Sequence, residues 1–209
     1  MQDIRRLISG FRRFQQNYFK SDNTLYEQLG RGQSPKVLMI GCSDSRVDPA
    51  ILTDCRLGDI FVVRNVANLV PPYEPDGRYH GVSSAVEYAV RFLKVEHVIV
   101  MGHSHCGGID ALMHSTTNPV SEFVEQWVAI ACSARQAVQR ELAHKSDALK
   151  CRACEQAAIL ISLENLLTFP WVADRVKEGS LALHGWYFDI EAGQLLGYRP
   201  DTGEFEQLA

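Results

Sequence analysis

The sequence predicts an α/β fold: a mainly parallel sheet of four strands with one added antiparallel strand, flanked by helices. Three short runs are rich in valine and isoleucine and almost wholly apolar, as is typical of strands that a parallel sheet buries on both faces. Helical patterns alternate with these runs, which indicates parallel strands joined by crossover helices. Two further apolar runs near the C-terminus are split by a turn that contains glycine, and they predict a final hairpin.

The N-terminal segment is predicted to be an amphipathic helix rather than a secretory signal. It has a basic start but neither a long apolar core nor a small-residue cleavage site. Its apolar residues recur at the spacing of one helical face. These residues are Ile4, Leu7, Ile8, Phe11 and Phe14.

The other elements are expected in regular order along the chain. Strands are predicted at 36–41, 60–65 and 97–102, and the two halves of the hairpin at 181–190 and 194–198. Helices are predicted at 83–94, 118–144 and 147–169, and a loop at 69–81. A short helix should follow the first strand, with Asp48 as its N-cap and Pro49 at its first position.

Length and composition limit the classes of protein to consider. The 209 residues favour a single domain, expected to span 1–209. The net charge of -4 gives no reason to expect nucleic acid or an anionic membrane as a partner. No apolar run reaches the about 18 residues of a membrane-spanning helix. Without a secretory signal, the six cysteines are expected to be reduced, and the protein cytoplasmic.

Potential metal ligands follow two of the predicted strands. Cys42 comes after the first strand, and His103 and Cys106 come after the third. The carboxyl ends of parallel strands meet at one edge of a sheet, where the ligand sites of open α/β folds gather. Two thiolates and one imidazole suit Zn²⁺, which prefers tetrahedral coordination by nitrogen and sulfur. The sequence therefore predicts a zinc site with its fourth position undecided.

Asp44 is the main candidate for the fourth zinc ligand, because the His105 side chain is expected to point away from the ion. Asp44 and Arg46 stand two residues apart, so that in an extended segment they share a face and can form a two-pronged ion pair. If Asp44 binds zinc, the site is closed. If Arg46 holds Asp44, a water can take the fourth place and become hydroxide near neutral pH. Two thiolates donate more charge than imidazoles, so activity is expected to rise toward alkaline pH.

The remaining cysteines are interpreted as packing residues. Cys151 and Cys154 form a C-x-x-C motif, which is typical of redox and metal sites. The motif lies inside a helical pattern, however, and no third or fourth ligand is near it in the sequence. Buried free cysteines are commonly inert, and Cys55 and Cys132 receive the same interpretation.

Taken together, the stretches "CSDSR" at 42–46 and "GHSHCGG" at 102–108 resemble the β-class carbonic anhydrases. The resemblance extends from about residue 33 to residue 112. Within the family, "GQSPKVLMIGCSDSR", "FVVRNVANLVPPY" and "EYAV" are similar to the plant-type branch. The resemblance implies reversible hydration of carbon dioxide to bicarbonate and a proton by zinc-bound hydroxide. It implies zinc ligation by Cys42, His103 and Cys106, and a catalytic dyad of Asp44 and Arg46.

The resemblance also implies an apolar substrate pocket. Phe61, Val66 and Tyr88 would line it, and Gln33 would reach the substrate across a subunit interface. An apolar slot with one amide donor suffices for a small uncharged molecule such as carbon dioxide. Ser43, beside the first zinc cysteine, is also expected to contact substrate.

Two glycines are expected to complete the pocket. Gly107 and Gly108 would allow close backbone approach at the start of a helix, whose amides could stabilise a developing anion. Another branch of the family is regulated by bicarbonate bound away from the zinc. The chain is similar to that branch at Arg64 but departs from it at Met39 and Phe188, so we favour an open zinc site held by the dyad.

The resemblance further implies self-association as a dimer or a dimer of dimers. The N-terminal helical arm, 1–32, would pack on the partner subunit, where its apolar stripe would be covered. Two other functions stay open. One is a related hydrolase that acts on carbon disulfide or carbonyl sulfide with the same zinc ligands. The other is a scaffold stabilised by zinc, against which the dyad and Gln33 argue because a scaffold needs neither.

Overall fold

The computed structural model describes residues 2–20, 23–114 and 121–209, which belong to two compact units, Met1–Ser34 and Pro35–Ala209. The first unit is helical, as predicted for the N-terminal segment. It contains α1 (Gln2–Gln15), the π-helical turn η1 (Gln16–Lys20) and α2 (Thr24–Leu29). None of the described side chains of α1 is buried, and Ile4, Leu7, Ile8 and Phe11 are all exposed.

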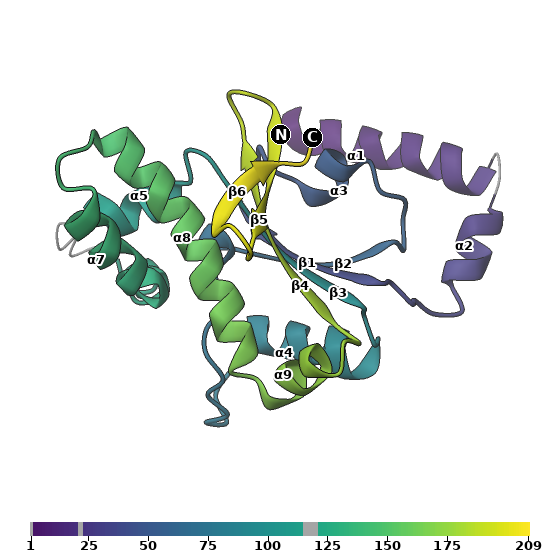
Figure 1. Cartoon of the computed structure of the whole chain (residues 1–209). Helices are drawn as coiled ribbons and strands as arrows, with labels where there is room; N and C mark the ends of the chain where they lie inside the picture. Colours follow the sequence, from purple (N-terminus) through teal and green to yellow (C-terminus); the bar gives the residue numbers. More distant parts are fainter. Residues whose placement is uncertain (1, 21–22, 115–120) are drawn as a thin grey trace. The chain divides into compact units, whose positions relative to one another are not determined.

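A six-stranded mixed sheet forms the centre of the second unit (Figure 1). The strands lie in the order β2-β1-β3-β4-β5-β6; the first four are parallel, and β5 and β6 are each added by antiparallel pairing with the strand before it. Their bounds are β1 (Val37–Cys42), β2 (Ile60–Asn65), β3 (His97–His103), β4 (Ala182–Asp189), β5 (Gln194–Arg199) and β6 (Glu204–Gln207). The predicted α/β fold and its five strands are confirmed.

Two features of the sheet differ from the prediction. The sixth strand, β6, was not expected, because it is short and carries two glutamates, and only its pairing with β5 makes it a strand. The second strand was expected to be buried on both faces, as β1 and β3 are. Instead β2 is an edge strand paired only with β1, and its Val62 is 39% exposed.

The strand order breaks next to β1. The chain passes from β1 to β2 on one side and then to β3 on the other, and such a break opens a crevice at the carboxyl ends of the strands. In the register of the sheet, Gly41 of β1 is paired with Arg64 of β2 and with Met101 of β3. Cys42 and His103 therefore end neighbouring strands at one edge of the sheet, as predicted.

Helices cover the sheet and enclose this edge. Those in and beside the predicted ranges are α3 (Pro49–Thr53), α4 (Gly81–Glu87) with η3 (Tyr88–Phe92), α8 (Asp147–Leu167) and α9 (Pro170–Lys177). The predicted range 118–144 contains α6 (Val124–Val128), η4 (Ala129–Ala131) and α7 (Cys132–Glu141), whereas η2 (Val66–Asn68) and α5 (Gly107–His114) lie outside the predicted helices. Asp48 caps α3 by accepting hydrogen bonds from the backbone of Ala50 and Ile51, which confirms the predicted cap.

The single helix predicted at 118–144 is wrong. Residues 118–120 lie outside the described residues, and the helical part of this stretch begins at Val124. A 3₁₀ turn then interrupts the α-helix, and Ala131, at φ −98° and ψ 19°, leaves α-helical geometry and redirects the chain. Three short segments replace the one long helix.

Two large apolar clusters hold the second unit together. In the first, strand residues such as Leu38 and Val100 pack against α4, α8 and α9, and α4 and α9 lie on the same side of the sheet (Figure 1). The second lies at the carboxyl edge, where Cys42 and Cys106 pack with residues of α5, α7 and α8. The candidate metal ligands are thus part of an apolar core.

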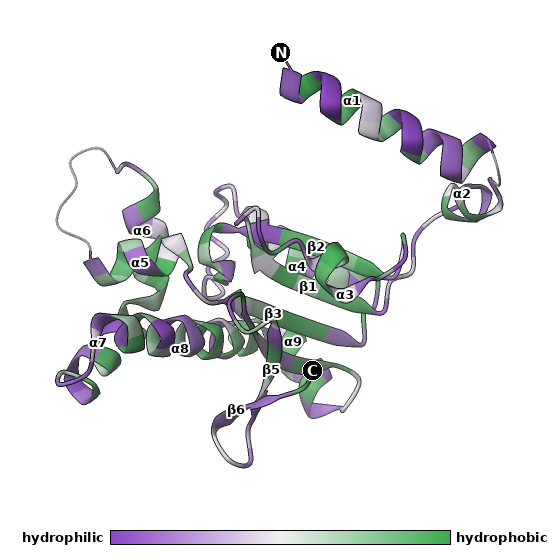
Figure 2. Ribbon diagram, turned by 90° about the horizontal axis from the view of Figure 1, so that it is seen from above, coloured by the Kyte–Doolittle hydropathy of each residue, from purple (hydrophilic) through white to green (hydrophobic). Residues whose placement is uncertain are grey.

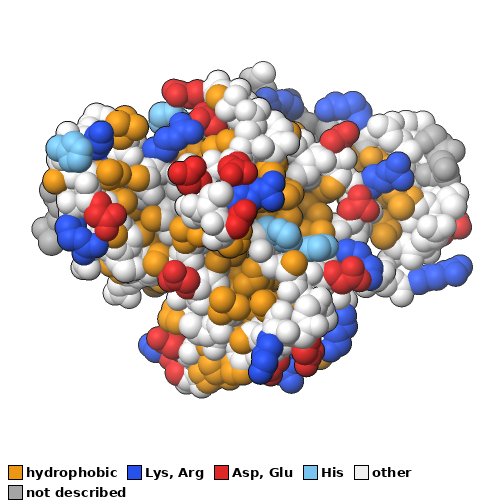
Figure 3. Space-filling view, viewed as in Figure 1, with side chains coloured by type: hydrophobic (Ala, Val, Ile, Leu, Met, Phe, Trp, Pro, Cys, Tyr) orange, Lys and Arg blue, Asp and Glu red, His pale blue; other side chains and the backbone are white. Residues whose placement is uncertain are grey.

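Apolar residues are concentrated in the sheet, and charged residues of both signs lie on the surface. The strands of the sheet are mainly hydrophobic (Figure 2), whereas acidic and basic side chains are interspersed over the face seen in Figure 3. In the described part of the chain no single helix is long and apolar enough to cross a membrane. Only α8 and α9 taken together meet that test, and they are bent by 93°.

Candidate metal centre

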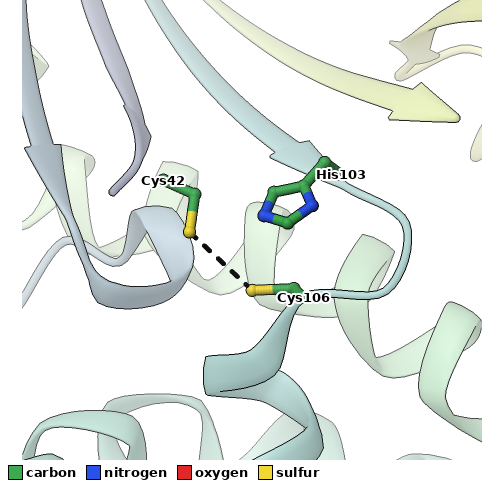
Figure 4. A group of neighbouring side chains, drawn as sticks. All are labelled: Cys42, His103 and Cys106. Atoms are coloured by element: carbon green, nitrogen blue, oxygen red, sulfur yellow. Dashed lines mark hydrogen bonds between the residues drawn. The ribbon is translucent and has the colours of Figure 1, made fainter. Parts of the chain in front are cut away.

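The three predicted ligands come together at the carboxyl edge of the sheet (Figure 4). Cys42 ends β1, His103 ends β3 and Cys106 immediately precedes α5. All three are buried, and one ligand atom from each lies within 4.8 Å of the others. The two sulfurs are 4.0 Å apart. A tetrahedral ion with sulfur and nitrogen ligands, such as Zn²⁺, fits this donor set.

The orientation of the His103 imidazole supports metal binding. Its Nδ1 donates a hydrogen bond to the carbonyl oxygen of Ser104 over 2.9 Å. In the neutral ring this leaves Nε2 with a free lone pair, and Nε2 is buried without a hydrogen-bond partner among the described residues. A buried polar atom without a partner is costly, and metal-bound histidines normally donate their other nitrogen in this way.

The turn from His103 to Cys106 is held in a strained conformation. His105 adopts φ +58°, a left-handed conformation that costs a non-glycine residue about 1–2 kcal/mol. Arg46 Nη2 donates to the His105 carbonyl oxygen over 3.0 Å and stabilises this backbone. The His105 side chain is exposed beside Glu191, which agrees with the expectation that it points away from the ligands.

The two sulfurs share one proton, and the negative charge is favoured on Cys42. The hydrogen bond between them lowers the pKa of Cys42 and raises that of Cys106, because the pair shares one proton. The backbone amide of Asp44 also approaches Cys42 Sγ at 3.4 Å. A divalent cation would relieve the repulsion between two thiolates, so its binding would displace the remaining proton.

The predicted ion pair between Asp44 and Arg46 is formed. Arg46 donates from Nε to Asp44 Oδ1 over 3.0 Å and from Nη2 to Oδ2 over 2.7 Å. Its backbone amide also donates to Oδ1 over 2.9 Å. The Arg46 side chain is the largest cause that holds the pKa of the Asp44 carboxyl well below its usual range. Asp44 is therefore an ionised acceptor whose oxygens are both engaged by Arg46.

A second arginine holds the backbone of the same loop. Arg64 of β2 donates to the carbonyl oxygens of Cys42 over 2.8 Å and of Asp44 over 2.7 Å. Its third contact is with the Asp48 carboxylate that caps α3. In the sequence, Arg64 stood out only as a point of similarity to another branch of the family. Its contacts could not be predicted, because its partners lie 16 or more residues away along the chain.

Glu155 of α8 is a positioning residue that the sequence did not reveal. It is buried, and one carboxylate oxygen accepts from the backbone amide of Cys106 over 3.0 Å. The other oxygen accepts from the Tyr187 hydroxyl over 2.7 Å. Glu155 thereby connects the third ligand to α8 and to β4. The signal in the sequence was a charged residue on the helix face that also carries Ile159 and Leu166.

The predicted apolar pocket residues fall into two groups. Val66 follows β2 at the edge that carries the ligands, and it lines a mostly apolar cavity of about 860 Å³ with Trp127 and Ile130. Phe61 lies near the other end of β2, paired with Leu38 instead of with a residue near Cys42.

Tyr88 lies with Phe61 and not with Val66. The rings of Phe61 and Tyr88 are 5.8 Å apart, and Phe92 stacks on Tyr88 at 5.6 Å. Ser43 is exposed directly after the first ligand, and its amide donates to the Asn65 carbonyl oxygen. Gln33 belongs to the first unit, so its expected contact with substrate stays a prediction.

The two glycines have different surroundings. A Cβ at Gly107 would meet no atom within 4 Å, apart from its chain neighbours. A Cβ at Gly108 would lie 2.7 Å from Val66 Cγ1 and 2.9 Å from Ala67 Cβ. Ala67 itself has φ +63° and is fully buried, so it cannot easily move. Gly108 is thus required by close packing of α5 against η2.

Comparison with known proteins identifies relatives along nearly the whole chain. The family model described as carbonic anhydrase matches residues 37–195. Beta carbonic anhydrase 3 of Arabidopsis thaliana is 39% identical over 193 residues, which are 91% of this chain and 74% of that protein.

Solved structures are similar as well. The β-carbonic anhydrase CcaA superposes with a TM-score of 0.92 at 37% identity, covering 98% of this chain and 99% of the other. A tetrameric β-carbonic anhydrase of Sordaria macrospora superposes with a TM-score of 0.76 at 27% identity, covering 94% and 93%.

We expect Gly108→Ala to destabilise the protein by about 1–3 kcal/mol, because the added methyl group overpacks the contact with η2. Gly107→Ala is the matched control and should change stability by less than about 0.5 kcal/mol, since its Cβ has room. Urea unfolding of both variants measures the difference. Equal stabilities would contradict a packing role for Gly108.

We expect Glu155→Ala to weaken metal binding about 10- to 100-fold, because the Cys106 amide and the Tyr187 hydroxyl lose their buried acceptors. In Glu155→Gln, the amide oxygen can accept from Cys106 and the amide nitrogen can donate to the Tyr187 oxygen. The glutamine variant should therefore retain most of the affinity. Competition with a chelator measures both, and wild-type affinity in Glu155→Ala would contradict the positioning role.

Proposed function

This chain belongs to the β class of the carbonic anhydrase family, and from that premise we propose that it hydrates carbon dioxide with a zinc ion held by Cys42, His103 and Cys106. The observation that carries the proposal is the buried His103 Nε2, which has no hydrogen-bond partner among the described residues and whose ring faces two cysteine sulfurs. A zinc ion bound there would act as a Lewis acid that lowers the pKa of a coordinated water and supplies hydroxide near neutral pH.

Asp44 would orient the nucleophile rather than bind the metal. Its carboxylate is engaged by Arg46 on both oxygens, which favours the open form of the site. Oδ2 accepts only one hydrogen bond from Arg46 and still has a lone pair that can accept another from a group above the ligands. Because Arg46 keeps the pKa of Asp44 low, this acceptor stays ionised at every pH at which the enzyme would work.

The substrate pocket would be completed by a second copy of the chain. Val66 lies at the metal edge, whereas Phe61 and Tyr88 lie toward the other end of β2, so one subunit alone does not unite the three. β2 is an unpaired edge, and Val62 and Phe92 expose apolar surface near it. Pairing of two such edges would bring the Phe61 and Tyr88 of one subunit toward the metal edge of the other.

Other features support this self-association. α1 exposes an apolar stripe that a partner subunit would cover, and Gln33, in the same N-terminal unit, would then reach the partner's substrate. The Sordaria macrospora relative is described as tetrameric, and we propose a dimer or a dimer of dimers for this chain. All six cysteines lie in the described part of the chain and are free, as expected of a protein in the reducing cytoplasm.

The proposed activity is tested by stopped-flow hydration of carbon dioxide on zinc-loaded protein, from about pH 6.5 to about pH 9. The rate should rise toward alkaline pH as the coordinated water ionises, since two thiolates make that water less acidic. Asp44 cannot cause a loss of rate at the lower end, because its pKa lies well below that range. Absence of hydration at every pH, together with hydrogen sulfide release from carbonyl sulfide, would favour the related hydrolase.

We expect Asp44→Asn to keep its zinc and to lose about 10²-fold or more in kcat/KM. The asparagine amide cannot accept from Arg46 on both sides, so the nucleophile would lose its oriented acceptor. Asp54→Asn, at the end of α3, is the matched control and should leave the rate unchanged. Near-normal turnover in Asp44→Asn would refute a catalytic role for the pair of Asp44 and Arg46.

A further inference from the structure

A second group of potential metal ligands lies between α5 and α8. Asp110 and His114 stand one turn apart on α5, and Cys151 lies on α8. One ligand atom from each lies within 4.8 Å of the other two. The sequence placed Cys151 in a motif without further ligands, because only the tertiary packing of α8 beside α5 brings the carboxylate and the imidazole to it.

We propose that Asp110, His114 and Cys151 form a second divalent-metal site suited to Zn²⁺. A carboxylate, an imidazole and a thiolate are all zinc ligands, and an i, i+4 pair on one helix with a third ligand from its neighbour is a geometry that one ion can bridge. His114 Nδ1 is 2.9 Å from Asp110 Oδ1, so these two groups already face each other.

The surroundings of the site favour a cation. The cavity beside it has a volume of about 450 Å³, and three further carboxylates line it: Asp147, Glu155 and Glu191. Burial raises the pKa of the Cys151 thiol, and the negative charges of Asp110 and Glu155 raise it further. A divalent ion would be attracted by this field and would favour the thiolate over the thiol.

This site should bind more weakly than the first. Asp110 and His114 are exposed and Cys151 is half-buried, whereas all three residues of the first site are buried. Arg152 also lines the cavity and pairs with Asp189, and Lys150 pairs with Asp147, so these cations offset part of the carboxylate charge. A bound ion would link α5 to α8. α5 begins next to Cys106 and α8 carries Glu155, so the ion should also stabilise the two helices that position the first site against unfolding.

The test uses tag-free full-length protein loaded with one zinc per chain, which fills the tighter first site and leaves the second empty, and this protein is titrated with Co²⁺. Cobalt bound by a thiolate gives an intense near-ultraviolet charge-transfer band, so the band reports Cys151 ligation. Zinc is measured in the same samples, and only cobalt bound without release of zinc is counted. We expect about one added cobalt per chain with a thiolate band in the wild type.

Variants assign the ligands. Cys151→Ser should abolish the band, and His114→Ala should weaken cobalt binding by about tenfold or more. Cys55→Ser and His144→Ala are the matched controls, since both residues lie elsewhere in the unit, and both variants should behave as the wild type. Absence of a second ion, a second ion without the thiolate band, or a band that survives Cys151→Ser would each overturn the proposal.

Discussion

Parallel pairing of β1 with β3 places the ends of two neighbouring strands side by side, and the metal centre depends on that adjacency. The register sets Gly41 opposite Met101, so Cys42, one residue further along β1, and His103, two residues further along β3, lie at the same edge. The chain then needs only one strained turn at His105 to return Cys106 to the other two. The hydrogen bond from His103 to Ser104 occupies Nδ1, so the backbone determines that Nε2 is the nitrogen available to a metal.

Two arginines, Arg64 and Arg46, stabilise different parts of the loop after β1. Arg64 binds its carbonyl oxygens and thereby fixes its path, whereas Arg46 engages both oxygens of the Asp44 carboxylate. Arg46 also donates to the backbone of His105, which links the loop after β1 to the loop after β3. The same side chain therefore keeps the aspartate ionised and stabilises the turn that delivers Cys106.

Those parts of the molecule that depend on local patterning were predictable from sequence. The parallel strands, the Asp48 cap and the meeting of the three candidate ligands follow from apolar runs, helix start signals and residue types at strand ends. What could not be predicted depends on tertiary neighbours. β6 becomes a strand only through β5, Gly108 is constrained by Val66 and Ala67, and Glu155 reaches Cys106 across 49 residues of sequence. The helix break at Ala131 could not be predicted either, because no proline or glycine marks it in the sequence.

The central claim is that metal binding and catalysis are one property of the Cys42, His103 and Cys106 site. Its most direct test measures tightly bound zinc and carbon dioxide hydration on the same preparations of wild type, Cys42→Ala and Cys55→Ala. We expect the wild type and Cys55→Ala to retain zinc and activity, because Cys55 takes no part in the site, and Cys42→Ala to lose both together. Hydration at an undiminished rate by zinc-free Cys42→Ala would contradict the account.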